Sequence, residues 1–281
     1  VNAYYKRYVD PPTAWTQFDS DSGSGINWKA TLYKQNFGPS YVDQVMQVIF
    51  NATEDDQWYY VTQPVNFTVE RDDVGFSYVA GNETVVNRIG NDNVTFIVYV
   101  YDADNPTHPP VTGSNGPGMF WITRNASDPE SWDEGTPKQT NDTGYLVYEF
   151  NATCEHGVGK QRWKAGIVEG STYYKPANFS ETFNVTIVSE FEPNLVSPIN
   201  QSFLKGIDPI PLLANLPDLD GCGFVPGANV TFHVEGTTYT YQGVGNGSGW
   251  YNTTITDTNL PEYTYGWYNV TVNASREFYS N

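Results

Sequence analysis

The residues with the densest chemical signal in this chain are asparagines in the acceptor triplet for N-linked glycans. Asn-X-Ser/Thr, with X not Pro, occurs fifteen times, where chance placement of the same residues would give about four. An acceptor must reach solvent, so we predict covalent N-glycans on loops and outward strand positions. The acceptors are Asn51, Asn66, Asn82, Asn93, Asn125, Asn141, Asn151, Asn178, Asn184, Asn200, Asn229, Asn246, Asn252, Asn269 and Asn273.

Strand alternation offers another explanation for part of this set. Asn-Val-Thr alternates polar and apolar residues, which by itself accounts for the triplets at Asn93, Asn184 and Asn269. Alternation does not account for Asn125 or Asn141, which stand among turn-forming residues.

The only two cysteines, Cys154 and Cys222, form the next constellation. An even pair in an exported protein predicts a disulfide. The two residues fall in different repeat units, so a bond within one chain would join neighbouring units. A bond between chains and two free thiols are the alternatives. The spacing excludes a Cys-X-X-Cys metal or redox motif.

Closely spaced carboxylates occur as Asp-X-Asp once in each of three regions. Such pairs can supply the hard oxygen ligands that Ca²⁺ prefers, and they also occur as ordinary turn residues. A complete twelve-residue calcium loop is absent from the sequence. The candidate Ca²⁺ ligands are Asp19, Asp21, Asp102, Asp104, Asp218 and Asp220.

Signals for catalysis are weak. His108, His156 and His233 are far apart, and His156, although close to Cys154, is read as a turn residue. The glycine-rich segment 113–118 is not followed by Lys-Ser/Thr, so it predicts a turn and not a phosphate loop. We expect no enzymatic activity, and no cofactor other than structural Ca²⁺.

The elements that position these residues are expected to be strands. The chain has 281 residues, enough for two to three sandwich units of about 100 residues each. It contains 21 Tyr, 15 Phe, 8 Trp, 25 Gly and 18 Pro, a composition typical of β-sheets with many turns. The net charge of −18 argues against nucleic-acid and anionic-membrane partners. No apolar run is long enough to span a membrane, and any export signal is expected to have been removed.

A repeat organises the chain. The middle region runs from Phe150 through a glycine-rich turn to a strand around Trp163, then to Tyr173-Tyr174 and the alternating strand 182–188. In the N-terminal region the strands 28–33 and 44–50 repeat the later part of this order. In the C-terminal region 249–254 and 266–272 repeat its earlier part, and Phe278-Tyr279 parallels Tyr173-Tyr174.

These repeats predict an all-β fold of tandem immunoglobulin-like β-sandwich domains. We expect units at 1–84, 85–192 and 193–281, with the first a partial sandwich plus linker and the last without its final strand. Either the chain is part of a longer array, or neighbouring subunits complete each other's sheets by strand addition. The Trp and Tyr of the repeated strand, at Trp163 and Trp267, are expected to fill the cores. Other aromatics, such as Trp58-Tyr59-Tyr60, are expected at the surface, where they could bind sugars or other subunits.

The motif Gly-Trp-Tyr-Asn-Val-Thr-Val at 266–272, followed by Asn-Ala-Ser and a downstream Tyr-Ser-Asn, resembles the tandem immunoglobulin-like repeats of archaeal cell-surface glycoproteins. S-layer, sheath and large adhesin proteins carry such repeats. The resemblance covers 195–281 most clearly and 86–190 less so. It implies an extracellular location and a structural or adhesive role.

Together these features predict a non-catalytic, heavily N-glycosylated structural subunit of an extracellular surface assembly, such as an S-layer, sheath, filament or stalk. Its expected partners are further copies of itself in a homopolymer or lattice, and covalent N-glycans. The alternative is an adhesin or glycan-binding module that uses exposed aromatics.

Overall fold

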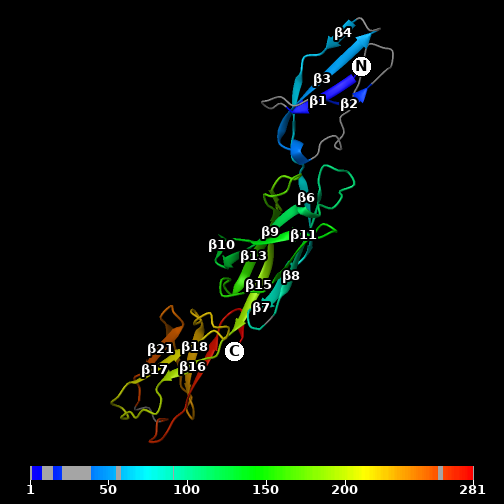
Figure 1. Cartoon of the computed structure of the whole chain (residues 1–281). Helices are drawn as coiled ribbons and strands as arrows, with labels where there is room; N and C mark the ends of the chain where they lie inside the picture. The colour runs from blue at the N-terminus through cyan, green and yellow to red at the C-terminus, as the bar shows by residue number, and fades with distance from the viewer. Residues whose placement is uncertain are drawn as a thin grey trace.

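The computed structural model describes residues 2–7, 15–20, 39–54, 58–90, 92–258 and 262–280. Its regular elements in those ranges are strands, apart from the short 3-10 helix Pro39–Tyr41. The predicted all-β fold class is therefore confirmed. The strands form three successive units along an elongated chain (Figure 1). In the described part of the chain, no helix has the length and apolar character needed to cross a membrane.

The middle unit is a two-sheet sandwich of the immunoglobulin type. One sheet consists of β6 (Val74–Ala80), β8 (Val94–Asp102) and β12 (Tyr145–Phe150). The other is built on β9 (Gly113–Asn125), β13 (Gly159–Ile167) and β15 (Phe183–Glu190). The shorter strands that pair with these three are β7 (Thr84–Asn87), β10 (Asp128–Trp132), β11 (Thr136–Thr140) and β14 (Ala177–Asn178).

Alternation along the strands builds the core of this sandwich. On β13 the buried residues Gln161, Trp163 and Ala165 alternate with three outward cationic residues. The Trp163 ring is fully buried, and its centroid lies 4.4 Å from that of Phe96 in a stacked arrangement. The indole Nε1–H donates to the Gly81 carbonyl oxygen at 3.0 Å, so burial leaves no unsatisfied polar atom on this side chain.

The glycine-rich segment 113–118 is the first half of β9 and not the turn that we predicted. Its glycines serve close packing. A Cβ at Gly116 would collide with Thr140, and a Cβ at Gly118 would collide with Leu146. The prediction failed because glycine in a strand can mark the close approach of a neighbour as well as a turn.

The last unit repeats the sandwich with fewer strands. One sheet has the order β16 (Asn194–Ser197), β17 (Ile210–Asn215), β21 (Trp250–Ile255) and β20 (Val244–Gly245). The other has the order β19 (Thr240–Gln242), β18 (Asn229–Val234) and β22 (Val270–Ser275). The chain then returns to the middle unit, where β23 (Tyr279–Ser280) pairs in parallel with the end of β15.

The first unit is described as one sheet. Its order is β2 (Thr16–Ser20), β1 (Asn2–Arg7), β3 (Gln44–Glu54) and β4 (Trp58–Val61), and β5 (Val65–Val69) also pairs with β3. The predicted strand around Trp28 lies outside the described residues.

The boundary expected at residue 85 does not match the strand pairing. β6 lies within the range 1–84 that was assigned to the first unit, yet it pairs with β8 of the middle sandwich. The place of β6 in the middle sandwich is evident only from its long-range pairing with β8, since burial does not alternate clearly along β6.

The two aromatic strands of the repeat also differ in burial. Trp163 lies in the core as expected, whereas Trp267 is 82% exposed and precedes the start of β22 at Val270. The prediction for Trp267 was therefore wrong. The local motif is similar, but β22 begins three positions later than the motif suggested, so the indole lies on a loop outside the sheet.

We expect Trp163→Ala to destabilise the middle sandwich by about 3–5 kcal/mol, because it removes the largest fully buried ring and leaves a cavity. Urea unfolding followed by circular dichroism would measure the change. The matched control is Trp267→Ala, which removes an exposed indole and should shift stability by less than about 0.5 kcal/mol. Equal effects of the two substitutions would contradict this assignment of the core.

Candidate functional site

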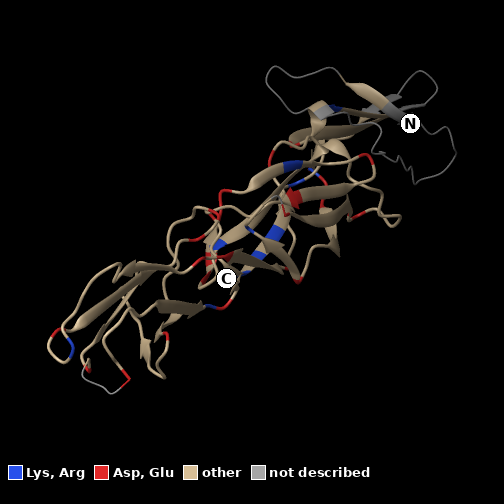
Figure 2. Ribbon diagram, turned by 90° about the horizontal axis from the view of Figure 1, so that it is seen from below, with Lys and Arg blue, Asp and Glu red and all other residues tan. Residues whose placement is uncertain are grey.

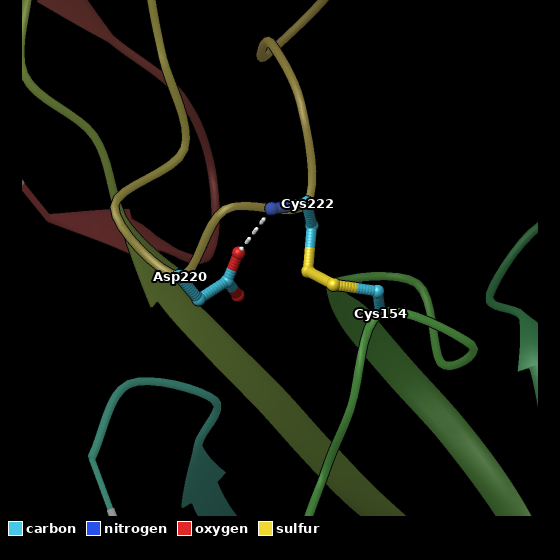
Figure 3. Close-up of side chains that lie close together, drawn as sticks. All are labelled: Cys154, Asp220 and Cys222. Atoms are coloured by element: carbon cyan, nitrogen blue, oxygen red, sulfur yellow. Dashed lines mark hydrogen bonds between the residues drawn. A yellow bond between two sulfur atoms is a disulfide. The ribbon is translucent and has the colours of Figure 1, made fainter.

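The predicted disulfide partners meet at the junction between the middle and last sandwiches. Cys154 lies on the loop from β12 to β13, and Cys222 lies on the loop from β17 to β18. Their sulfurs are bonded within one chain, with the Cα atoms 5.3 Å apart (Figure 3). The bond joins two units, as the positions of the cysteines in the repeat suggested. It also consumes the Cys154 thiol, so a Cys–His pair with the buried His156 has no nucleophile.

A buried ion cluster lies beside the disulfide. Arg88, which follows β7 of the middle sandwich, donates from Nη2 to Asp218 and from Nε to Asp220 of the last sandwich. Its Nη1 donates to the His156 carbonyl oxygen at 3.2 Å. Ser189 donates its hydroxyl hydrogen to Asp218 Oδ1 at 2.8 Å. Both ends of the guanidinium are therefore held by hydrogen-bonded partners, as burial of a charge requires.

The two carboxylates respond differently to this environment. Burial is the main cause that raises the pKa of Asp218 above its ordinary value. Burial also acts to raise the pKa of Asp220, but its hydrogen bonds with the Cys222 N–H, Asp218 and Arg88 together lower it. Asp220 therefore stabilises the fold above the ordinary Asp pKa of about 3.9, and this contribution is lost as pH falls through the lowered pKa.

The Asp218–Asp220 pair was a candidate Ca²⁺ site, and the structure gives these carboxylates a guanidinium instead. Among the described residues, the one group of metal-ligating side chains that converges is Cys154, Asp220 and Cys222, and its two sulfurs are already joined to each other. A disulfide supplies no thiolate ligand, so this group does not form a metal centre.

The junction between the first unit and the middle sandwich has the same backbone hydrogen bond as the junction between the middle and last sandwiches. The central residue of each Asp-X-Asp donates its N–H to the segment entering from the previous unit: Ala103 to the Asp73 carbonyl at 3.1 Å, and Leu219 to the Glu190 carbonyl at 3.0 Å. A tyrosine hydroxyl also approaches the first carboxylate of each pair. Tyr174 lies 3.5 Å from Asp102, and Tyr279 lies 3.4 Å from Asp218. The sequence parallel between Tyr173-Tyr174 and Phe278-Tyr279 thus has a structural counterpart.

The two junctions differ in charge compensation. A hydrogen bond with Asp72, with burial and repulsion from Asp72, Asp73 and Asp102, raises the pKa of Asp104. In the second junction, Arg88 places a guanidinium between the two carboxylates of the pair. Ca²⁺ at Asp102 and Asp104 stays a prediction. Asp19 lies on β2 opposite Ala3, and Asp21 lies outside the described residues.

The glycan acceptors share a surface location. All fifteen sequon asparagines fall within the described residues, and none is buried. Asn51 and Asn184 are half-buried and the others are exposed. Asn184 is held by its side chain, which donates to Glu83 Oε1 at 2.7 Å. The acceptors on strands, such as Asn252 and Asn273, occupy outward positions of the alternation. This is the geometry that glycan attachment requires.

Sequence reasoning missed two features of the chain. The first is Arg88, since no local motif distinguishes it from other basic residues. The second is an aromatic end of the last sandwich, formed by the loop 198–209 and the loop 262–269. A cavity of about 290 Å³ between them is lined by Tyr263, Tyr268 and Lys205, among others. Tyr265, which also lines the cavity, is 95% exposed, as Trp267 nearby is 82%. The side chains of Trp58, Tyr59 and Tyr60 lie outside the described part of the structure.

The fold and the junction together define a chain of tandem immunoglobulin-like sandwiches. No protein-family model matches the sequence, and no curated protein matches it either. Among solved structures, a tetra-tandem repeat from the extending region of a large adhesion protein is similar, with 11% identity and a TM-score of 0.45. The match covers 97% of this chain and 65% of that one, so this chain spans less than two thirds of that structure.

Two further structures are similar at the same level. A 1.5-MDa bacterial ice-binding adhesin matches with 12% identity and a TM-score of 0.25, over 100% of this chain and 87% of that one. The FN1-FN3 domains of chicken CNTN1 match with 10% identity and a TM-score of 0.26, over 98% of this chain and 90% of that one. At such identities the likeness concerns the fold alone.

We expect the disulfide and the Arg88 cluster to hold the junction independently. Arg88→Met leaves two buried carboxylates facing each other, which should cost about 3–5 kcal/mol, but the disulfide keeps the units tethered. Reduction alone should leave the Arg88 contacts in place. Only the reduced variant should let the two sandwiches move apart, seen as an increased radius of gyration in X-ray scattering and rapid proteolysis near Phe191.

Arg162→Met, which removes a half-exposed arginine, is the matched control for this experiment and should stay compact when reduced. Acidifying the reduced wild-type protein through the lowered pKa of Asp220, which lies below the ordinary Asp value of about 3.9, should also loosen the junction, because Asp220 then loses its charge. Separation of the units by reduction alone at neutral pH would show that the ion cluster contributes little.

Proposed function

We propose that this chain is a non-catalytic structural part of an extracellular surface assembly, built from tandem immunoglobulin-like units and carrying N-glycans. The observation that carries this proposal is the doubly secured junction. A covalent bond and a buried ion cluster both join the middle sandwich to the next one. Units fixed to each other in this way transmit force and hold a constant spacing, which is what a wall, filament or stalk requires.

The same residues support an extracellular location. A structural disulfide between two loops is typical of an oxidising, extracellular environment. The surface position of the sequon asparagines makes the chain a suitable N-glycan carrier. The net charge of −18 favours a hydrated surface that resists non-specific association. The resemblance of the 266–272 motif to archaeal cell-surface repeats narrows the proposal to an S-layer, sheath, filament or stalk.

Electron microscopy of the natively produced material tests this function. We expect ordered sheets, tubes or filaments, with particle spacing set by the sandwich units. Reductant should soften the assembly because it removes the bond between Cys154 and Cys222. EDTA should disassemble it if Ca²⁺ binds at Asp102 and Asp104, whereas EDTA without effect would count against Ca²⁺. Monodisperse single particles under every condition would refute the structural function.

The aromatic end of the last sandwich favours a second function, that of an adhesin or glycan-binding module. The 290 Å³ cavity is mostly apolar, with a few hydroxyl groups and the Lys205 ammonium at its wall, a composition typical of ligand sites. Tyr265 and Trp267 expose two large rings beside it, and such exposure often marks a binding surface.

For this second function we expect oligosaccharides on a glycan array to bind the wild-type chain and to lose binding in Tyr265→Ser/Trp267→Ser. Loss of two aromatic faces should weaken binding at least tenfold, since each contributes about 1 kcal/mol or more. Val244→Ser is the matched control, because Val244 is an exposed apolar residue on β20. Equal binding by both variants would contradict a site at this end.

A further inference from the structure

A row of three basic residues stands on the outer face of the middle sandwich. Lys160, Arg162 and Lys164 occupy alternate outward positions of β13, opposite the buried Gln161 and Trp163. Alternation places all three on the same face of the sheet. The whole chain has 14 Lys and Arg against 32 Asp and Glu, so three cations on one strand form a local exception. Figure 2 shows blue segments on the strands of the middle sandwich.

Two indole rings give this basic row a fixed platform. The Lys164 ammonium lies 4.2 Å from the Trp132 ring centroid and 5.5 Å from that of Trp121. The Arg162 guanidinium lies 5.7 Å from the Trp132 centroid, and its Nη2 donates to Thr182 Oγ1 at 2.8 Å. Cation–π contacts hold long side chains in place without neutralising their charge. Arg162 and Lys164 are therefore ordered before any partner arrives, which lowers the entropy cost of binding.

The row has little compensation within its own chain. Arg162 has one acidic neighbour, Glu130, at 3.8 Å, and that carboxylate is largely exposed. Within the described ranges, no carboxylate forms an ion pair with Lys160 or Lys164. β13 carries no glycan acceptor. The acceptor paired across from Arg162 is Asn184, one of the two half-buried sequon asparagines. A glycan on Asn184 would therefore border the row beside Arg162, whereas Lys164 pairs on its other side with Trp121, which is not an acceptor.

A complementary surface exists on the same sandwich, at its end next to the first unit. Asp73 and Asp104 are exposed there, beside Asp72 and Asp102. Lys175 lies 3.3 Å from Asp73 and also contacts Glu70, so one ammonium serves several acids. The equivalent Asp-X-Asp in the second junction receives a guanidinium from another unit. Asp73 and Asp104 therefore offer two exposed carboxylates to a cationic side chain.

We propose that the basic row Lys160–Arg162–Lys164 of one chain docks on the Asp73–Asp104 end of the middle sandwich in a second copy of this chain. The proposal rests on the structural function proposed above and names the surface through which copies associate. The two patches are different, so the contact is heterologous. A heterologous contact repeats from copy to copy and builds an open string unless its rotation closes a ring. Charge complementarity sets the partner and the register of such a contact.

Sedimentation velocity of the full chain, over a range of protein and salt concentrations, tests this interface by charge reversal. Lys160→Glu/Lys164→Glu should weaken self-association at least tenfold, and added salt should weaken the wild-type association as it screens the charges. Lys138→Glu is the matched control, because Lys138 is a lysine on β11 of the same sandwich and outside the basic row, and it should associate like the wild type. Thermal unfolding midpoints near the wild-type value would show that all variants are folded.

The reciprocal variant completes the test. Asp73→Lys/Asp104→Lys should also fail to associate alone, but an equimolar mixture with Lys160→Glu/Lys164→Glu should recover association, since each acidic patch again meets a basic one. The interface would be overturned if the mixture did not recover association. It would also be overturned if Lys160→Glu/Lys164→Glu associated like the wild type. If micrographs of native material still showed an ordered assembly in that case, the structural function would stand and only this surface would be wrong.

Binding of an anionic polysaccharide to the basic row is tested by a separate measurement. Polygalacturonate, a carboxylated polysaccharide, serves as a probe for an anionic glycan partner. With such a partner, the wild-type chain would stay monomeric at every concentration and yet bind polygalacturonate through Lys160 and Lys164. This result would overturn docking of a second copy and assign the basic row to anionic polysaccharide.

Discussion

A single buried guanidinium determines how the last two sandwiches are placed. Arg88 belongs to the middle unit, and the two carboxylates that hold it belong to the next. Because an unpaired buried charge is very costly, any rotation that separated Arg88 from Asp218 and Asp220 would be strongly disfavoured. The parallel pairing of β23 with β15 and the disulfide act at the same junction. The geometry of the chain beyond this point depends on these contacts.

The junction also explains how a repeat becomes an array. The middle and last sandwiches each form a separate core around large rings, as Trp163 and Tyr251 show. The contacts between units are instead polar and directional: an Asp-X-Asp turn, an entering strand and a tyrosine hydroxyl. Polar contacts of this kind fix orientation. The part of β15 that pairs with β23, Ser189 and Glu190, carries no glycan acceptor, and β23 carries none either.

Much of the fold was predictable because it depends on local chemistry. Alternation along 182–188 predicted a strand, and that segment lies almost wholly in β15. The acceptor triplets predicted surface asparagines, and none of them is buried. Other features escaped prediction because they depend on which strands pair. The sequence predicts a unit boundary after β6, a turn at 113–118 and a core position for Trp267, whereas β6 pairs with β8, 113–118 lies in β9 and Trp267 is exposed. In each case the local pattern is correct, but the strand or side chain that packs against it cannot be known from the sequence.

The sequence by itself determined the class of this protein: β-rich composition, turn spacing, acceptor triplets and a lone pair of cysteines are all properties of residues and their order. Only the tertiary structure decided what those residues do at the junction. It gave Asp218 and Asp220 a guanidinium from a residue 132 positions away from Asp220, and it placed the cations of Arg162 and Lys164 over two indoles on one face. The physical reason is that charge compensation depends on distance in space, which the sequence order of a β-sandwich does not reveal.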